Sequence, residues 1–324
     1  MNSNKTIFYP LDTTLAFEAA RTTESAAIAS YKWIGRGDEK SADQAAVDSM
    51  RNSLNKLSIK GKVVIGEGER DEAPMLYIGE KVGKGIGPNI DIALDPLEGT
   101  TICATGRSNS LAVLAFAQEG GFLNAPDVYM DKIAVGPGLP KEVIDLDESP
   151  KNNLINLAKA KKLNVSELVV CILDRPRHKE LISKCRETGA KIFLISDGDV
   201  AGVISASQFN GRVDIYMGIG GAPEGVLAAA ALRCIGGFMQ GRLVFANNKE
   251  ITRAQKLNIA DLNAKYELED LANGDVIFSA TGVTDGSMLK GVKLTKGKAE
   301  TQSILMHSHN QMVRMISTQH GIYE

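Results

Sequence analysis

Residues 95–100 read Asp-Pro-Leu-Glu-Gly-Thr and directly follow a largely apolar run. The apolar run is typical of a buried strand, and the proline, glycine and threonine predict a turn that leads into a helix. Asp95 and Glu98 therefore stand at a strand-to-helix corner, where two acids are costly to pack unless a cation binds them. Gly99 would let the backbone approach a ligand, and Thr100 would lie at a helix start that attracts anions. An ordinary turn with a helix cap is the alternative interpretation.

The composition is that of a globular protein. Its 324 residues carry a formal net charge of −2, which does not favour nucleic acid or an anionic membrane as a partner. No apolar run approaches the length that crosses a bilayer, and no signal-peptide core follows the first residues, so we expect a cytoplasmic protein. The four cysteines are scattered without a C-x-x-C pair, which is typical of reduced thiols rather than disulfides or a zinc site.

The first half of the chain mixes helices and strands without strict alternation. Helices are expected at residues 11–33 and 45–57, the second behind a capping box at residues 41–44. A more polar stretch at residues 141–162 indicates a domain boundary in or just after it. Strands are expected before it at residues 62–65, 90–94, 110–117 and 133–135.

From residue 167 the pattern becomes regular, with three successive units of strand, polar corner and helix. A last strand is expected in the tail, at residues 275–279. The sequence therefore predicts a mixed α/β protein with an N-terminal α+β domain at residues 1–165 and a C-terminal α/β domain at residues 166–324. The active site would lie between them, because such layers bind ligands at strand ends. The units comprise strands at residues 168–173, 191–195 and 213–217, and helices at residues 179–188, after residue 199 and at residues 226–234.

Acidic side chains recur at these corners and at helix starts. If several converge, each pair about 4 Å apart repels by roughly 4 kcal/mol at an effective dielectric constant near 20. Either their pKa values rise or a cation binds between them. A carboxylate cluster without histidine or cysteine favours Mg²⁺ or Mn²⁺, and we expect His307 and His309 at the surface rather than on a metal. The acids are Asp43, Glu67, Glu69, Asp71, Asp95, Glu98 and Glu224.

Groups that could bind anions follow two other strands. Arg175 and Arg177 flank Pro176 and could clamp a phosphate, although such a run is more often a solvated loop. The glycine-rich run at residues 218–225 would expose backbone N–H groups at a helix start, which suits phosphate. This run lacks the lysine of a P-loop and the third glycine of a dinucleotide fingerprint.

Acids suited to hard metals and groups suited to phosphate in one chain predict metal-assisted hydrolysis of a phosphate ester. Thr100, beside an acid such as Asp71, would orient the attacking water or supply the attacking hydroxyl. A non-catalytic sensor of sugar phosphates is the alternative from another functional class. The set of acids together with Thr100 argues against it, because a sensor needs no group that activates water.

These motifs together resemble a known family. Residues 95–100 are similar to the D-P-[I/L]-[D/E]-G-[S/T] signature of the lithium-sensitive, metal-dependent sugar and inositol phosphatases. The resemblance implies a layered α-β-α-β-α sandwich that hydrolyses the 1-phosphate of fructose 1,6-bisphosphate in gluconeogenesis with Mn²⁺ or Mg²⁺. Action on inositol phosphate or sedoheptulose 1,7-bisphosphate is the alternative within the same class. The segments closest to one branch, the bacterial class II fructose-1,6-bisphosphatases, are residues 24–26, 31–38, 66–69, 71–77, 124–127 and 218–225.

The resemblance also implies roles for single residues and a homo-oligomer, either a dimer or a tetramer. Some members carry a lysine directly after the aspartate that matches Asp38, whereas this chain has Glu39 and then Lys40, and neither receives a role. Asp71 and Thr100 are implied to activate or supply the nucleophile. The implied metal ligands are Asp43, Glu67, Asp95, Glu98 and Glu224. The implied substrate contacts are Glu98, Gly99, Thr100, Tyr129, Arg175, Pro176, Arg177, Asp197, Gly198, Asp199 and Gly221, with the arginines on the distant phosphate.

Overall fold

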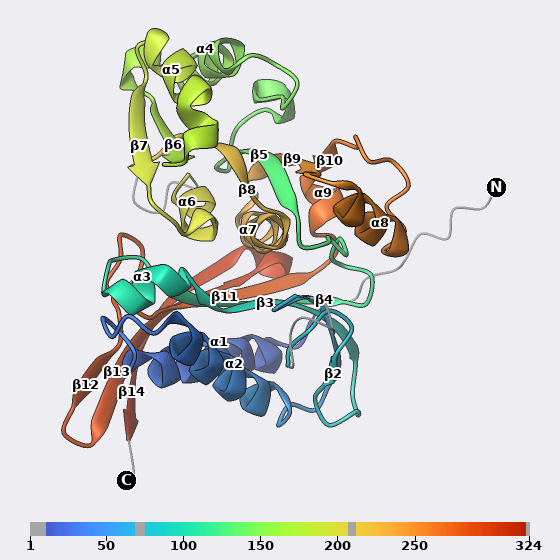
Figure 1. Cartoon of the computed structure of the whole chain (residues 1–324), viewed down its shortest axis with the longest axis vertical. Helices are drawn as coiled ribbons and strands as arrows, with labels where there is room; N and C mark the ends of the chain where they lie inside the picture. The colour runs from blue at the N-terminus through green and yellow to red at the C-terminus, as the bar shows by residue number, and fades with distance from the viewer. Residues whose placement is uncertain (1–10, 69–74, 207–211, 322–324) are drawn as a thin grey trace.

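The computed structural model describes residues 11–68, 75–206 and 212–321. Helices and sheets alternate in five layers: a helical pair, an eight-stranded sheet, a central helical layer, a six-stranded sheet and an outer helical pair (Figure 1). The layered α-β-α-β-α sandwich is thereby confirmed. Both sheets are mixed, with parallel and antiparallel pairs. None of the described helices combines the length and the apolar character that a membrane span requires.

The first helical layer covers one face of the eight-stranded sheet. α1 (Thr13–Tyr31) and α2 (Glu39–Leu54) pack on each other, and α1 also contacts strands across the sheet. Asp38 caps α2, because its carboxylate accepts a hydrogen bond from the backbone N–H of Ser41 at 3.0 Å. The capping box predicted at residues 41–44 is therefore wrong, since those residues already lie inside the helix.

The eight-stranded sheet gathers strands from both ends of the chain. Its order is β12-β13-β11-β4-β3-β1-β2, and β14 pairs with β13 at one edge. The tail therefore contributes four strands where one was predicted, and two of them, β12 and β14, contain no fully buried residue. The strands are β1 (Lys60–Ile65), β2 (Lys81–Val82), β3 (Asn89–Glu98), β4 (Leu111–Gln118), β11 (Val276–Gly282), β12 (Lys293–Thr295), β13 (Lys298–His307) and β14 (Met312–Gly321).

The six-stranded sheet contains the three regular units that were predicted from residue 167 onward. Its order is β10-β9-β5-β8-β6-β7, with β6 parallel to both β7 and β8. α4 (Pro150–Lys161) and α5 (Lys179–Glu187) pack together as the outer layer (Figure 1). The strands are β5 (Tyr129–Val135), β6 (Val169–Leu173), β7 (Lys191–Ile195), β8 (Ile215–Gly221), β9 (Phe238–Val244) and β10 (Tyr266–Glu267).

The predicted domain boundary at residue 165 does not follow the division between the sheets. β5 precedes residue 165 and β6 follows it, yet both belong to the six-stranded sheet, and β11 to β14 return to the eight-stranded sheet. β11 pairs with β4 so that Val276 lies opposite Ala117. Pairing between strands so distant in sequence has no local signature, so the polar stretch at residues 141–162 does not mark the division between the two sheets.

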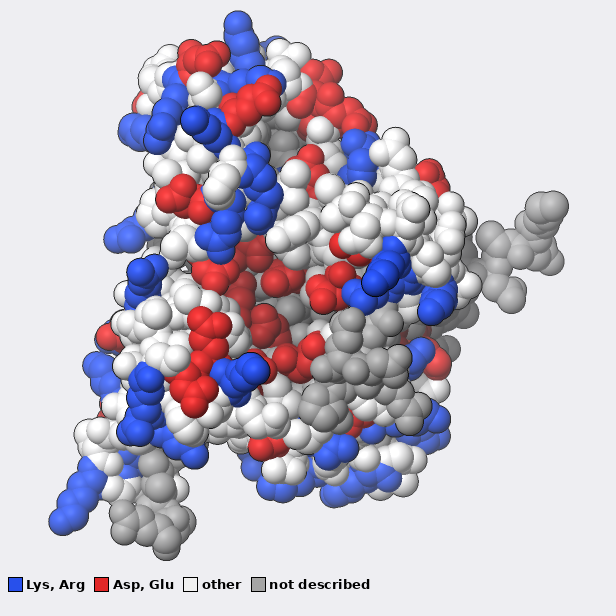
Figure 2. All heavy atoms as spheres, in the orientation of Figure 1, with Lys and Arg blue, Asp and Glu red and all other residues white. Residues whose placement is uncertain are grey.

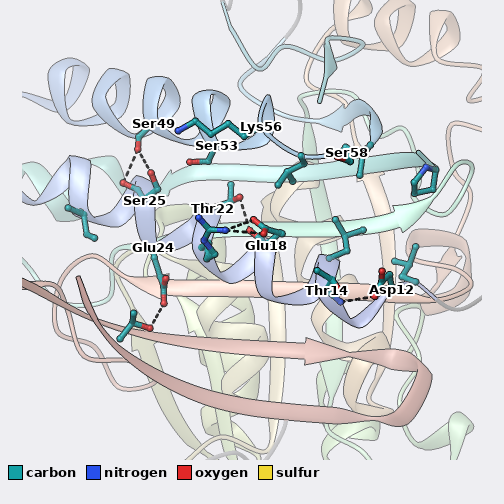
Figure 3. A pocket seen from close by; sticks show the side chains of 18 of the residues that line it. Asp12, Thr14, Glu18, Thr22, Glu24, Ser25, Ser49, Ser53, Lys56 and Ser58 are labelled. Atoms are coloured by element: carbon teal, nitrogen blue, oxygen red, sulfur yellow. Dashed lines mark hydrogen bonds and ion pairs between the residues drawn. The ribbon is translucent and has the colours of Figure 1, made fainter. Parts of the chain in front are cut away.

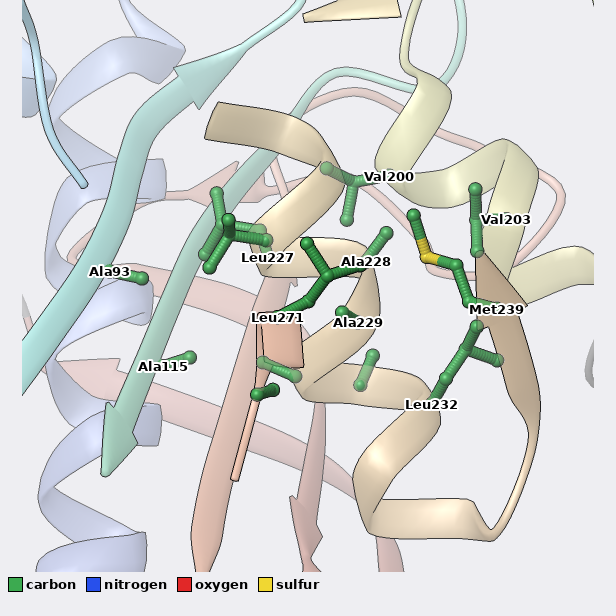
Figure 4. Close-up of a cluster of buried hydrophobic side chains, with 14 of the residues drawn as sticks. Ala93, Ala115, Val200, Val203, Leu227, Ala228, Ala229, Leu232, Met239 and Leu271 are labelled. Atoms are coloured by element: carbon green, nitrogen blue, oxygen red, sulfur yellow. The ribbon is translucent and has the colours of Figure 1, made fainter. Parts of the chain in front are cut away.

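α7 (Ala222–Ile235) lies between the two sheets and joins their cores. It is apolar on all sides, as expected of a helix without a solvent face. Its buried alanines, Ala228 to Ala231, let both sheets approach closely. Figure 4 shows Leu227 on the side of α7 that faces Ala93 and Ala115 of the first sheet, while Leu232 lies near Met239 of the second. The first turn of α7, which carries Glu224, is thus fixed between the sheets.

Candidate active site

The corner predicted after residue 94 is a bulge near the end of β3. Asp95 lies opposite Val113 and Glu98 opposite Leu111, so β3 contains one more residue than β4 over this stretch. Pro96 occupies the bulge, where its missing N–H costs no ladder hydrogen bond. The strand therefore continues through Glu98 rather than ending at Leu94.

Gly99 turns the chain from β3 into α3 (Thr100–Thr105) with a φ of 76°. A Cβ atom there would lie 2.9 Å from the side chain of Ile102, so the turn itself requires glycine. We expected this glycine to admit a ligand, but its own helix already explains it. Thr100 is half-buried at the first position of α3.

Glu98 is a buried acid, only 3% exposed, in the interior of the candidate site. Its Oε1 atom accepts a hydrogen bond from the backbone N–H of Val200 at 2.9 Å. Its Oε2 atom is buried without a hydrogen-bond partner among the described residues. Burial, with added repulsion from Asp199, raises the pKa of Glu98 well above its ordinary value. A buried carboxylate oxygen without a donor indicates a missing ligand at this point.

The five acids that the family resemblance implied as metal ligands interact through their charges. They come from α2, the end of β1, the end of β3 and the start of α7. Burial, together with Asp43 and Glu224, raises the pKa of Glu67 to about 8. Burial, together with Glu67, Glu98, Glu224 and Asp43, raises that of Asp95 well above its usual value. The charges of all five therefore act on one another.

These acids fit a hard divalent cation by their chemistry. Within residues 11–68, 75–206 and 212–321, no three carboxylate, histidine or cysteine side chains are spaced to hold a metal ion. The donors are nevertheless all oxygen atoms, and their mutual repulsion would be relieved by a bound cation. Oε2 of Glu98, which has no hydrogen-bond partner among the described residues, is an oxygen atom that such an ion would bind.

The glycine run at residues 218–225 makes room for acids rather than simply exposing backbone N–H groups. A Cβ atom at Gly220 would lie 2.0 Å from Oδ2 of Asp199. One at Gly221 would lie 1.9 Å from Oε2 of Glu224. Both glycines are therefore required by carboxylates that pack against the β8–α7 corner.

Two predicted substrate contacts lie at the start of α6 (Asp199–Ser205). Gly198 caps this helix with a φ of 80°, and Asp199 is the first helical residue, 6% exposed. Asp197 accepts a hydrogen bond from the Gly198 N–H at 3.1 Å and lies 3.6 Å from Nη2 of Arg175. The fold therefore places Asp197 and Asp199 on opposite sides of one glycine turn.

The two arginines lie near each other but are held by backbone carbonyl groups. Nη1 of Arg175 donates to the carbonyl oxygen of Ser196. Arg177 donates through Nε and Nη2 to the carbonyl oxygen of Ile219 at 3.0 and 2.8 Å. The guanidinium of Arg177 also lies 4.7 Å from the ring centroid of Tyr129. Pro176 lies between the two arginines in the sequence and begins a short 3-10 helix, Pro176–His178.

Three buried groups near this site received no role in the sequence analysis. His178 accepts a hydrogen bond from the N–H of Ile219 at 2.8 Å and donates to the carbonyl of Leu173 at 2.7 Å. Burial lowers its pKa, so the neutral ring fixes the corner after β6 onto β8. Lys132 donates to Oδ2 of Asp199, and the hydroxyl of Tyr216 is buried without a partner among the described residues. For Lys132, the available signal in the sequence was a lysine directly before the apolar residues 133–135.

The charged side chains on the surface are distributed in the same way as these acids and arginines. Figure 2 shows acidic side chains gathered in the hollow between the two halves of the molecule, with basic side chains directly above it. Asp71, the predicted partner of Thr100, lies outside the described residues.

A separate groove of about 1120 Å³ lies along α1, between α2 and β14 (Figure 3). Hydroxyl groups line much of it, and those of Ser25 and Ser49 are hydrogen-bonded at 2.6 Å. Glu24 in its wall accepts a hydrogen bond from Thr318 of β14 at 2.7 Å. None of the residues predicted for the active site lines this groove. It is therefore distinct from the acidic hollow.

Comparison with known proteins identifies relatives over almost the whole chain. The sequence model of the family described as bacterial fructose-1,6-bisphosphatase, glpX-encoded, matches residues 13–320. Fructose-1,6-bisphosphatase 1 class 2 of Escherichia coli (strain K12) is 48% identical over 319 residues, which cover 94% of this chain and 95% of that protein. Fructose-1,6-bisphosphatase class 2 of Shigella flexneri matches with the same identity and the same coverage.

The solved structures found by comparison are more distant in sequence. The extragenic suppressor protein SuhB of Bartonella henselae is 14% identical with a TM-score of 0.34, over 60% of this chain and 74% of that one. An inositol monophosphatase from Anabaena (Nostoc) sp. PCC 7120 is 12% identical with a TM-score of 0.32, over 63% of this chain and 73% of that one.

Proposed function

The chain belongs to the family of bacterial, glpX-encoded fructose-1,6-bisphosphatases, and on this premise we propose how its buried acids serve the reaction. The reaction is hydrolysis of fructose 1,6-bisphosphate to fructose 6-phosphate and inorganic phosphate, a step of gluconeogenesis. The acids Asp43, Glu67, Asp95, Glu98 and Glu224 bind a divalent metal, Mn²⁺ or Mg²⁺. The observation that carries this proposal is the buried Oε2 of Glu98, which has no donor among the described residues and lies among other acids.

A bound divalent ion would polarise the phosphoryl oxygens, lower the pKa of a bound water and neutralise the leaving oxygen. The chain's own residues do the rest. Thr100 directs its hydroxyl at the 1-phosphate, where it positions the attacking water or attacks itself, with Asp71 as the proton acceptor. The bond between phosphorus and the C1 oxygen breaks as the new P–O bond forms, and the C1 oxygen takes a proton from water, so the sugar leaves as fructose 6-phosphate. If Thr100 is the nucleophile, a water molecule then hydrolyses its phosphate ester and releases inorganic phosphate.

The remaining predicted contacts bind the substrate away from the reacting phosphorus. Arg175 and Arg177 hold the 6-phosphate, for which they exchange part of their hydrogen bonding to backbone carbonyls. Tyr129 packs beside Arg177 and keeps its guanidinium oriented. Asp197 and Asp199, together with the Gly198 turn, accept hydrogen bonds from sugar hydroxyls, and Gly99, Pro176 and Gly221 supply backbone contacts.

The decisive experiment is phosphate release by the purified protein. Fructose 1,6-bisphosphate, sedoheptulose 1,7-bisphosphate and inositol 1-phosphate are each supplied with Mn²⁺, with Mg²⁺, or with a chelator. We expect metal-dependent release with the highest kcat/KM for fructose 1,6-bisphosphate. Faster release from either other ester would reassign the substrate, and binding without any release would favour a sugar-phosphate sensor.

We further propose that the enzyme works in the cytoplasm as a homo-oligomer, a dimer or a tetramer. The family resemblance supports this assembly. Light scattering on the eluting protein should give a mass of two or four chains of 34.7 kDa. A mass of one chain over a hundredfold range of concentration would contradict it.

A further inference from the structure

Lys132 is the only lysine or arginine among the described residues whose side chain is buried. It is 1% exposed and lies in the middle of β5, opposite Gly218 of β8. A lysine in such a place is costly because its ammonium group has left water, and it is retained only when partners compensate for that loss. The partners of Lys132 therefore indicate what it does.

Both partners belong to the candidate active site. The ammonium group donates to Oδ2 of Asp199 and to the carbonyl oxygen of Gly221, the latter at 2.9 Å. Asp199 is the first residue of α6, and Gly221 is the last residue of β8 before α7. One side chain therefore joins three elements at the point where the central layer meets the six-stranded sheet.

The surrounding backbone is shaped to receive this ammonium group. A Cβ atom at Gly220 would lie 2.9 Å from Nζ of Lys132, and one at Gly225 would lie 3.2 Å from its Cδ atom. Two glycines of the run at residues 218–225 thus leave the space that Lys132 and Asp199 fill. The contact between Lys132 and Asp199 therefore depends on glycine at both positions, because any side chain there would disturb it.

The pair also decides how Asp199 can act on a ligand. Oδ2 is bonded to Lys132, while Oδ1 makes no hydrogen bond within the described part of the chain. Glu98 and Glu224 both lie close enough for their charges to act on that of Asp199. Without a cation beside it, the side chain of Asp199 would be repelled by these acids and would turn away from them. With Lys132 in place, one oxygen is fixed and the other is left to accept a hydrogen bond.

We propose that Lys132 is a positioning residue for substrate binding: it holds the side chain of Asp199 oriented so that Oδ1 accepts a hydrogen bond from a sugar hydroxyl. This inference rests on the proposed function, because it assigns Asp199 to the sugar rather than to the metal. Under this proposal, Lys132 takes no part in the chemical step at the phosphorus. The ammonium group itself makes no contact with the substrate.

The test compares Lys132→Met with a matched control, Lys161→Met. Lys161 also pairs with an aspartate, Asp214, but Lys161 is the last residue of α4 in the outer helical layer, and Asp214 directly precedes β8. We expect Lys132→Met to raise KM for fructose 1,6-bisphosphate about tenfold, the cost of one misplaced charge-assisted hydrogen bond, and to change kcat less. Hydrolysis of p-nitrophenyl phosphate, which has no sugar, should stay within about twofold of wild type. Lys161→Met should leave both reactions unchanged.

A purely structural role would give a different pattern. It would lower the melting temperature and reduce both reactions together, and that outcome would overturn the proposal. Lys132→Arg, which keeps the charge, should give a KM between wild type and Lys132→Met, and an Arg variant no better than Met would also overturn it. If Lys132→Met does not fold, Lys132→Gln replaces it, with the same expected rise in KM.

The proposal and the proposed function can fail separately. Calorimetric binding of fructose 6-phosphate to metal-free protein should be about tenfold weaker in Lys132→Met than in Lys161→Met. Equal binding by the two variants would reject the role of Lys132 even if the wild type hydrolyses fructose 1,6-bisphosphate. No hydrolysis by the wild type would reject the proposed function, while the binding difference would still decide on Lys132.

Discussion

The molecule buries carboxylates in two regions that differ in how their oxygens are used. Asp275, at the start of β11, is 8% exposed and accepts hydrogen bonds from the N–H of Leu11 at 2.6 Å, from Ser308 at 2.7 Å and from His307 at 3.0 Å. Burial alone would raise the pKa of Asp275, but these three donors outweigh it and hold the pKa below its ordinary value.

The acids around Glu98 have the opposite character. Oε2 of Glu98 has no donor among the described residues, and the pKa values of Glu67, Asp95, Glu98 and Glu224 are all raised. Burial itself is therefore not the distinction between the two regions. A buried acid that accepts hydrogen bonds from several donors stabilises the fold. A buried acid that faces other acids is instead a candidate to bind a ligand.

The largest effect is expected from Asp95→Asn. This change removes a charge from the cluster around Glu98, so kcat should fall by a factor on the order of 10³ while the protein remains folded. The free energy of unfolding without metal should rise by about 1 kcal/mol, because one source of repulsion is lost. Phosphate release and chemical denaturation measure the two quantities. Activity near that of the wild type would remove Asp95 from the metal site.

The matching change in the other region is Asp275→Ala. It leaves three donors without an acceptor, so the free energy of unfolding should fall by about 3 kcal/mol, at roughly 1 kcal/mol for each lost hydrogen bond. The kcat of the folded fraction should stay unchanged. Denaturation curves and activity at a temperature well below unfolding test this pair of expectations. A large loss of kcat with unchanged stability would mean that the two regions do not differ as described.

The two regions should also respond to pH with opposite signs. The raised pKa of Glu67, about 8, means that the folded metal-free protein binds more protons than the unfolded chain, so stability falls on the order of 2 kcal/mol between about pH 6 and pH 8. The lowered pKa of Asp275 acts the other way, and its contribution is lost as the pH falls below about 4. Denaturation across this range, with a chelator and with Mn²⁺, measures both. Mn²⁺ should remove this decline, and a decline of the same size with the metal bound would contradict this account.

The smallest effect concerns the basic side chains above the acids. Arg177→Ala should raise KM for fructose 1,6-bisphosphate about tenfold and that for a simple phosphate monoester much less, because only the bisphosphate presents a second phosphate. Steady-state kinetics on both substrates provide the measurement. Equal changes in the two KM values would exclude Arg177 as a clamp for the distal phosphate.

Much of the candidate site could be predicted from short stretches of sequence. Asp95, Glu98 and the glycine run at residues 218–225 are local patterns, and the fold places them at strand ends and helix starts as expected. The donors of a buried acid are not local. Asp275 takes its hydrogen bonds partly from Leu11, which is 264 positions away, so no sequence pattern showed that it is a structural acid.

His307 illustrates the same limit. Its position in the tail predicted a surface side chain, yet it is 3% exposed and bonded to Asp275, because β13 pairs with β11 in the interior of the first sheet. Lys132 was overlooked for a related reason. A lysine in a strand is normally assigned to the solvent face, and only the approach of α6 and of the β8–α7 corner gives it buried partners.

The sequence by itself determined the family, the reaction, the regular units of the six-stranded sheet and the acids that we propose as metal ligands. These are carried by residues close together in the chain, whose chemistry is visible one motif at a time. The tertiary structure alone decided which strands share a sheet, which buried acids have donors and which face one another. These properties depend on pairings between distant segments, and the energy of a buried charge is set by all the groups around it rather than by its neighbours in sequence.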